Sequence, residues 1–194
     1  MIAGVYALFE KLYNGKCYDS TGARVAQEIS ENDMVLECVC GTGSISKPVA
    51  PKCKRLIATD MSVNMLKHAQ KNCRECTNIT FKKADMMSPR CKNNRFDKVI
   101  AGSVIHVLDA PYRAVDELLR VCKPCGKVII PTYINAGKRS SELLVKFFDF
   151  FGANFTNQFD RESYKEFFIN GGYDAEIDIV DGRMPCAIAV ITKK

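Results

Sequence analysis

Short apolar runs of strand length alternate with longer stretches of helical periodicity along most of the chain. This alternation is typical of βαβ units, in which a helix connects two parallel strands of one sheet. Strands are predicted at residues 34–38, 55–59, 79–83, 98–101, 128–131, 175–180 and 186–192. The pattern therefore predicts an α/β fold with seven strands.

The connections between these strands are of two kinds. The first five strands are joined by segments long enough for helices, most clearly at 62–73 and 112–121. Crossovers of this kind are right-handed and make the strands they join parallel. The last two strands are separated by only a few residues around Asp181-Gly182, which leaves no room for a helix and predicts an antiparallel hairpin.

Two segments lie outside this alternation. Amphipathic stretches at 5–13 and 21–30 precede the first strand and could form a lid. Residues 135–159 are rich in phenylalanine, and Asp160 then caps a helix that ends near Gly171-Gly172. The aromatic segment predicts a buried helix on the sheet, an apolar wall around a substrate, or both. Its aromatic residues are Phe147, Phe148, Phe150, Phe151, Phe155 and Phe159.

The composition is that of a soluble globular protein, since 47% of the 194 residues are hydrophobic and 26% are charged. No apolar run approaches the roughly 18 residues of a spanning helix, and the first ten residues lack the basic start of a secretory signal. Ten cysteines in a chain that can build a core predict reduced thiols. We therefore expect a cytoplasmic protein without a membrane span.

The charge is unevenly distributed. The chain carries 28 basic and 22 acidic residues, but residues 47–98 hold 13 basic and 4 acidic ones. This excess predicts one basic face. Such a face can attract nucleic acid or anionic lipid, although scattered lysines on helices more often form only a solvated surface.

The most informative segment is an apolar strand that runs into a glycine turn, Glu37-Cys38-Val39-Cys40-Gly41-Thr42-Gly43. Gly41 and Gly43 let the backbone approach a ligand, and the following helix presents free N–H groups. Ser46 stands where the dinucleotide fingerprint has its third glycine, and no Lys-Ser or Lys-Thr follows as in a P-loop. The turn indicates a nucleotide-cofactor loop.

Carboxylates at the ends of the predicted strands strengthen this interpretation. Glu37 ends the first strand, Asp60 closes the second and Asp85 closes the third. A carboxylate at Asp60 can accept both hydroxyls of a ribose, and one at Asp85 can accept an exocyclic amine. The alternatives are an N-cap role for Asp60, on the helix beginning near Ser62, and a loop cap for Asp85.

With these motifs the chain resembles the class I S-adenosylmethionine-dependent methyltransferases, particularly the small type 11 group. Residues 96–100 resemble the fourth-strand motif of that family, and residues 119–127 resemble its Leu-Lys-Pro-Gly-Gly approach to the fifth strand. The resemblance implies a Rossmann-like sheet of order 3-2-1-4-5-7-6, with the last strand antiparallel and helices on both faces. It also implies S-adenosylmethionine as cofactor and S-adenosylhomocysteine as product.

The resemblance assigns the glycine turn to the methionine end of the cofactor, Asp60 to the ribose and the turn after the third strand to the adenine. The resemblance also assigns residues 103–106 to the loop beneath the sulfonium. Val39 departs from the family because it replaces the first loop glycine, and its branched side chain could crowd the cofactor. The cofactor-binding residues implied are Glu37, Val39, Gly41, Thr42, Gly43, Asp60, Met61, Met65, Asp85, Met86 and Ser103.

Methyl transfer from a sulfonium is an in-line displacement, so alignment and desolvation can supply most of the catalysis. A hydroxyl or thiol acceptor gains from a base, and His106 is the best-placed candidate for a base or acceptor contact. More often such a histidine only hydrogen-bonds within its loop. Tyr6, Tyr13 and Tyr18 could close over the cofactor from the N-terminal lid, or pack that segment onto the domain.

Two cysteine pairs have the internal spacing of a zinc site, Cys73 with Cys76 and Cys122 with Cys125. The expected sheet order places the two pairs several strands apart, so no metal site is predicted. No cysteine pattern compels a soft metalloid acceptor either.

We expect one methyltransferase domain over 1–194, with an N-terminal helical lid (1–33), a cofactor-binding core (34–134), an aromatic insertion (135–159) and a final helix and hairpin (160–194). The leading hypothesis is methyl transfer to a small-molecule acceptor by a monomer or homodimer. One alternative is an RNA or other nucleic-acid methyltransferase that uses the basic 47–98 face. The other, motivated by Val39, is a non-catalytic cofactor-binding module.

Overall fold

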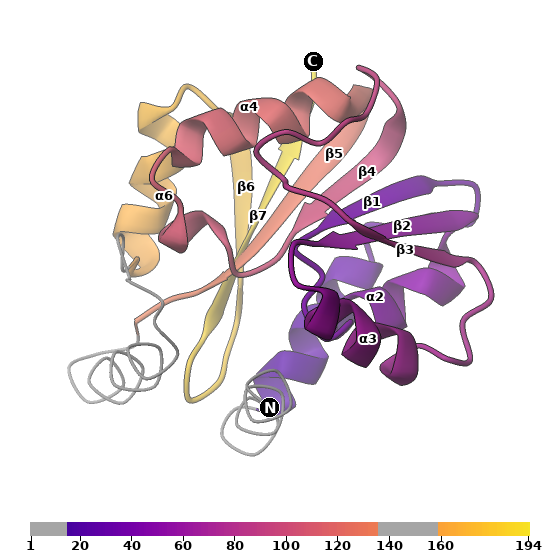
Figure 1. Ribbon diagram of the computed structural model, residues 1–194. Helices are drawn as coiled ribbons and strands as arrows, with labels where there is room; N and C mark the ends of the chain where they lie inside the picture. The colour runs from indigo at the N-terminus through magenta and orange to yellow at the C-terminus, as the bar shows by residue number, and fades with distance from the viewer. Residues whose placement is uncertain (1–14, 136–158) are drawn as a thin grey trace.

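The computed structural model describes residues 15–135 and 159–194, in which seven strands form one sheet of order β3-β2-β1-β4-β5-β7-β6 (Figure 1). The first five strands pair in parallel, and β7 pairs antiparallel with both β5 and β6. The predicted order and the antiparallel last strand are confirmed. The strands are β1 (Met34–Cys38), β2 (Arg55–Asp60), β3 (Ile79–Lys83), β4 (Phe96–Ala101), β5 (Cys122–Tyr133), β6 (Ala175–Val180) and β7 (Cys186–Thr192).

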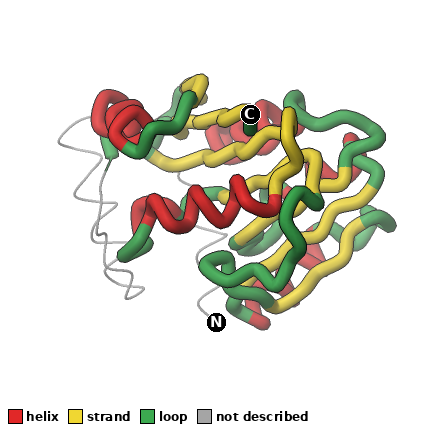
Figure 2. Tube along the Cα trace, turned by 90° about the horizontal axis from the view of Figure 1, so that it is seen from above, coloured by secondary structure: helices red, strands yellow, loops and turns green. Residues whose placement is uncertain are grey.

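Helices cover both faces of the sheet, as expected (Figures 1 and 2). Successive strand residues point to opposite faces, so Val35 packs in one buried cluster and Leu36 in the other. The first cluster includes side chains from the helix at 15–26, from α2 (Ser46–Val49) and from α3 (Val63–Asn72). The second includes side chains from α4 (Pro111–Val121) and α6 (Arg161–Asn170).

Local capping fixes where two of these helices begin. Ser62 caps α3 by accepting a hydrogen bond from the Met65 N–H at 3.3 Å. Asp160 and Ser163 form a reciprocal capping box at the start of α6, which confirms the predicted cap. Tyr164 is fully buried and donates its hydroxyl to the carbonyl of Ile130, so α6 is fastened to β5.

Some predicted boundaries were too narrow or displaced. β5 spans 122–133 where only 128–131 was expected. The strand extends further because pairing with β4 begins at Cys122, although Lys123, Pro124 and Cys125 do not form a buried apolar run. The helix expected at 21–30 covers 15–26 in the described chain, followed by turns. None of the helices in the described ranges is long and apolar enough to span a membrane.

The connection from β3 to β4 contains no helix, contrary to the expectation for a parallel crossover (Figure 1). Residues 84–95 lack helical apolar spacing, and Pro89 removes one backbone donor. Arg120 of α4 holds this segment by donating to the carbonyl oxygens of Cys91 at 3.0 Å and Pro89 at 3.3 Å. The same guanidinium donates to Asn93 Oδ1 at 2.6 Å. An anchored irregular loop therefore replaces the crossover helix.

Candidate active site

The turn after β1 has an unusual backbone. Val39, Gly41 and Gly43 all have positive φ angles, of 55°, 53° and 84°. The turn is closed by hydrogen bonds from Cys40 N to the Thr59 carbonyl at 2.8 Å and from Gly43 N to the Cys40 carbonyl at 2.9 Å. A branched residue in this region is a rare conformation that a surrounding structure must enforce, and such conformations cluster at functional sites.

The two glycines are needed for different reasons. A Cβ at Gly43 would lie 3.0 Å from Cys73 Sγ and 3.2 Å from Ala69 Cα, so this glycine lets α3 approach the turn. A Cβ at Gly41 would meet nothing within 4 Å, so Gly41 is favoured by its φ angle alone. Open space beside Gly41 leaves its backbone accessible to a ligand.

Glu37 lies at the floor of this turn and is 2% exposed. Its carboxylate accepts a hydrogen bond from the Ser46 hydroxyl. The pKa of the Glu37 carboxyl is raised to about 8, chiefly by burial and in smaller part by the nearby Asp60, whereas the hydrogen bond from Ser46 opposes the shift. The site thus holds an acid that a positive ligand group would ionise.

Asp60 connects the end of β2 with the glycine turn. One carboxylate oxygen accepts from Gly41 N at 2.9 Å and the other from Ser62 N at 2.8 Å. The helix cap proper is Ser62, so the N-cap alternative for Asp60 is wrong. Asp60 is 6% exposed and its carboxylate is fixed beside the turn, where further lone pairs can accept a ligand hydroxyl.

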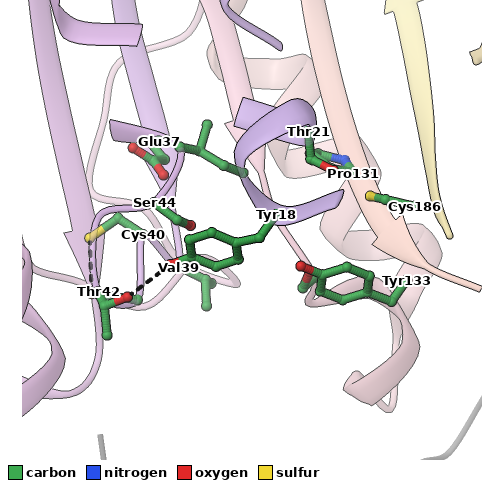
Figure 3. A pocket seen from close by; sticks show the side chains of 14 residues that line it. Tyr18, Thr21, Glu37, Val39, Cys40, Thr42, Ser44, Pro131, Tyr133 and Cys186 are labelled. Atoms are coloured by element: carbon green, nitrogen blue, oxygen red, sulfur yellow. Dashed lines mark hydrogen bonds between the residues drawn. The ribbon is translucent and has the colours of Figure 1, made fainter. Parts of the chain in front are cut away.

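A cavity of about 70 Å³ lies over the turn, and Figure 3 shows its lining. The Tyr18 ring extends from the N-terminal helix across the cavity, where its hydroxyl lies 3.3 Å from Thr42 Oγ1. The predicted residues that line this cavity are Tyr18, Glu37, Val39, Gly41, Thr42 and Ser103. Tyr6 and Tyr13 lie outside the described residues.

The loop after β4 places Ser103 on the cavity wall but not His106. Ser103 has a positive φ of 52°, donates its N–H to the Pro131 carbonyl at 2.7 Å and lines the cavity. His106 is only 4% exposed and is not among the residues that line this cavity. Burial lowers the pKa of His106 to about 4, so its imidazole is neutral at physiological pH. Its role as a base stays a prediction.

The structure divides the remaining residues that were predicted to bind the cofactor. Met61, with 63% of its surface exposed, and Asp85 line a second and larger cavity beside the first site. Asp85 also accepts from Met87 N at 2.9 Å, as a loop cap does. Met86 is buried in the core, and Met65 lies on the first turn of α3; neither lines the two cavities.

Several lining residues were not predicted from the sequence. Thr21, Tyr133 and Cys186 complete the wall of the cavity at the turn (Figure 3). Tyr133 is the last residue of β5, and its position at the carboxyl edge of a parallel strand is the signal that could have identified it. Ser46 was considered only as a missing glycine, whereas its hydroxyl contacts Glu37.

The cysteines show no grouping that suggests a metal ligand set. In the described parts of the chain, no cluster of three or more histidine, cysteine, aspartate or glutamate side chains could hold a metal ion. All ten cysteines are free, and burial raises the pKa of Cys38 and of Cys73 to about 12. These two buried thiols therefore stay protonated and serve as packing groups.

Comparison with known proteins finds methyltransferases among the proteins similar to this chain. The family described as "Methyltransferase domain" matches residues 36–130. A demethylmenaquinone methyltransferase of Renibacterium salmoninarum is 32% identical over 99 residues, which cover 51% of this chain and 40% of the relative. One from Paenarthrobacter aurescens is 30% identical over 108 residues, covering 56% and 42%. The chain thus spans less than half the length of these curated relatives.

Solved structures share the fold at low identity. A methyltransferase of Haloferax volcanii described as putative, in complex with the activator Trm112, has a TM-score of 0.76 at 15% identity, covering 98% of this chain and 95% of that one. An S-adenosylmethionine-dependent methyltransferase of Aquifex aeolicus has a TM-score of 0.68 at 19% identity, covering 96% and 98%. The domain match, which covers just under half of the chain, and the sheet order show the fold of the class I S-adenosylmethionine-dependent methyltransferases.

Proposed function

We propose that this chain transfers the methyl group of S-adenosylmethionine to a small-molecule acceptor. The observation that carries the proposal is the turn after β1, where three residues of positive φ are tied to Asp60 through Gly41 N. A turn of this kind leaves backbone groups open to a ligand beside a fixed carboxylate. These are the contacts that an amino-acid end and a ribose require.

The described residues suit the parts of that cofactor. Glu37, Thr42 and the open backbone of Gly41 would hold the methionine end, with Glu37 facing its ammonium group. Asp60 would accept the ribose hydroxyls. Met61 and Asp85 would contact the adenine, one through its exposed apolar side chain and the other through its carboxylate. Ser103 would close the site from the loop after β4.

The cofactor supplies a methyl group on a positively charged sulfur, which an acceptor displaces in line. The chain's own contribution is alignment and exclusion of water, for which Tyr18 and Tyr133 are placed on the cavity wall. We propose His106 as the base or acceptor contact for a hydroxyl or thiol; burial lowers its pKa to about 4, so its imidazole is neutral but only weakly basic.

The names of the relatives and the cavity wall bear on the class of acceptor. The curated relatives are named for demethylmenaquinone, an acceptor class that would suit aromatic walls. We propose a small organic acceptor without naming it, bound by one domain over 1–194 that acts as a monomer or homodimer. Ten free cysteines suit a reducing compartment such as the cytoplasm.

The nucleic-acid alternative receives less support. The basic excess of residues 47–98 does not form one face, because Lys67 and Lys71 lie on α3 whereas Arg90 and Arg95 flank a cavity on the opposite face of the sheet. Part of the basic excess therefore lies away from the cavity. A methyltransferase that reads RNA would show a steep dependence of binding on salt concentration.

Calorimetry with S-adenosylmethionine and S-adenosylhomocysteine tests the proposal, together with transfer of tritium from labelled cofactor to a metabolite extract. We expect binding of both compounds and a labelled small-molecule product. Binding without any labelled product would favour the cofactor-binding module. Absence of binding to either compound would contradict the whole proposal, and label in RNA would contradict the acceptor class.

A further inference from the structure

The larger cavity lies beneath the helix-free connection between β3 and β4. Its volume is about 620 Å³, against about 70 Å³ over the glycine turn. Its walls come from β1, β2, β3 and the connection at 84–95. The lining residues include Leu36 and Ile57 from the strands and Pro89 and Cys91 from the connection. An apolar floor is thus left in the place that a crossover helix would otherwise cover.

This cavity extends well beyond the proposed adenine contacts. It begins at Met61 and Asp85, at the carboxyl ends of β2 and β3, and reaches Ile57 and Arg95. Four residues of strand separate Ile57 from Met61, which corresponds to about 13 Å. Adenine at the carboxyl edge would therefore leave the deeper part of the cavity vacant.

Positive charge surrounds the cavity. Lys82, Lys83, Arg90 and Arg95 line it and are exposed, and Asp85 is the one carboxylate among its described lining residues. Within 15–135 and 159–194, none of these four cations makes an ion pair. Like charges that share a cavity repel one another, and a bound anion relieves that repulsion.

The cavity is held in shape before any ligand arrives. Arg120 fixes the connection through three hydrogen bonds, to the carbonyls of Pro89 and Cys91 and to Asn93. The backbone of Asn94 donates to the Arg120 carbonyl at 3.0 Å, which fastens the connection a second time. A preformed site loses less entropy on binding than a loop that must first be ordered.

We propose that this cavity binds a small organic anion, with its apolar body on Leu36, Ile57 and Cys91 and its carboxylate, phosphate or sulfonate group at Arg90 and Arg95. The ligand occupies a part of the cavity that the cofactor does not reach, although Met61 and Asp85 border both sites. The inference therefore does not depend on methyl transfer, and a chain without that activity would still carry the site.

The test uses 1-anilinonaphthalene-8-sulfonate as the probe, which combines a flat apolar body with one sulfonate. Fluorescence titration of the full chain should show saturable binding at one site. The double variant Arg90→Gln with Arg95→Gln should weaken that binding about tenfold. The matched control, Lys67→Gln with Lys71→Gln, removes the same charge from α3 on the opposite face and should leave affinity unchanged. Thermal melts of all three proteins check that each is folded.

Saturating S-adenosylhomocysteine should leave probe binding intact. Displacement of the probe would show that the cavity is only the adenine end of the cofactor site, and an equal loss in both double variants would reduce the effect to net charge. Either result overturns the inference. A third contrary result would be that a single-stranded oligonucleotide binds more tightly than the probe and that both double variants weaken its binding equally. Calorimetry with S-adenosylhomocysteine on the same samples separates this outcome from failure of the proposed function.

Discussion

The turn at 39–44 and the connection at 84–95 each follow a parallel strand of one sheet, yet they are built by opposite means. The turn is short, carries three residues of positive φ and is packed against α3, and its cavity measures about 70 Å³. The connection is longer, has no helix and covers a cavity of about 620 Å³. The large cavity is therefore found where the fold lacks a helix, whereas the polar groups that would bind the cofactor converge at the small cavity.

The largest effect is expected where the turn is packed most tightly. Gly43→Ala should lower the free energy of unfolding by about 3 kcal/mol, since the new Cβ is strained by a φ of 84° and meets α3. Gly41→Ala is the matched control because its Cβ meets nothing, and it should cost only about 1 kcal/mol. Urea unfolding measures both, and equal losses would show that contact with α3 is unimportant.

The connection should respond to loss of its anchor. Arg120→Met removes the hydrogen bonds to Pro89, Cys91 and Asn93 and should lower the free energy of unfolding by about 2 kcal/mol. Hydrogen exchange of amides in 84–95 should become faster, while exchange in the turn stays unchanged. Arg113→Met, at an exposed position of the same helix, is the control. Unchanged exchange in 84–95 would contradict the anchoring role.

The buried acid of the turn should couple cofactor binding to protons. Glu37→Gln should weaken binding of S-adenosylhomocysteine about tenfold, because it removes the charge that faces the ammonium group. Since the pKa of Glu37 is raised to about 8, the wild-type chain should release a proton on binding near pH 7. Calorimetry in buffers of different ionisation enthalpy detects this release. Glu31→Gln, an exposed change in a preceding turn, should keep it.

Glu37 also gives stability a definite dependence on pH. The folded state holds the Glu37 proton up to about pH 8, whereas the ordinary pKa of a glutamate is 4.5. Between these two pH values the folded chain therefore binds more protons than the unfolded chain. The stability contributed by Glu37 is therefore complete below pH 4.5 and is lost as pH rises through 8. Urea unfolding across this range should show the loss in the wild type and not in Glu37→Gln. A wild-type profile parallel to that of the variant would contradict the buried-acid assignment.

The smallest effect concerns Val39. Val39→Gly removes a branched side chain from the cavity and from a φ of 55°, and should tighten binding of S-adenosylhomocysteine about threefold. Asn94→Gly relieves a similar φ of 52° in the connection and should leave that affinity unchanged. Weaker binding by Val39→Gly would show that the valine supports the turn instead of crowding it.

The fold was predictable from the sequence because its signals are local. Apolar runs located β3, β6 and β7 at their observed bounds, and Asp160 located the start of α6. The extension of β5 to 122–133 was not predictable, because it depends on pairing with β4 and β7 and not on its own side chains. The missing crossover helix was overlooked for a related reason: the length of 84–95 permits a helix, and only its spacing argues against one.

The candidate site was predictable where backbone motifs define it. Glu37, Gly41 and Asp60 follow from strand ends and glycines, and the structure brings them together. Met65 and Met86 were also expected in the site but line neither cavity, because sequence spacing alone does not tell whether a side chain enters a cavity or the core. Tyr133 was missed because β5 was expected to end at residue 131, and the contact of Ser46 with Glu37 depends on how the glycine turn between them folds.

The central claim is that the glycine turn and Asp60 together receive an adenosyl cofactor. A crystal grown with S-adenosylhomocysteine tests it most directly. We expect electron density for the amino-acid end against Gly41 and for the ribose hydroxyls at Asp60. Density only in the cavity between Leu36 and Arg95, or a turn still filled by Val39 and Tyr18, would contradict the account.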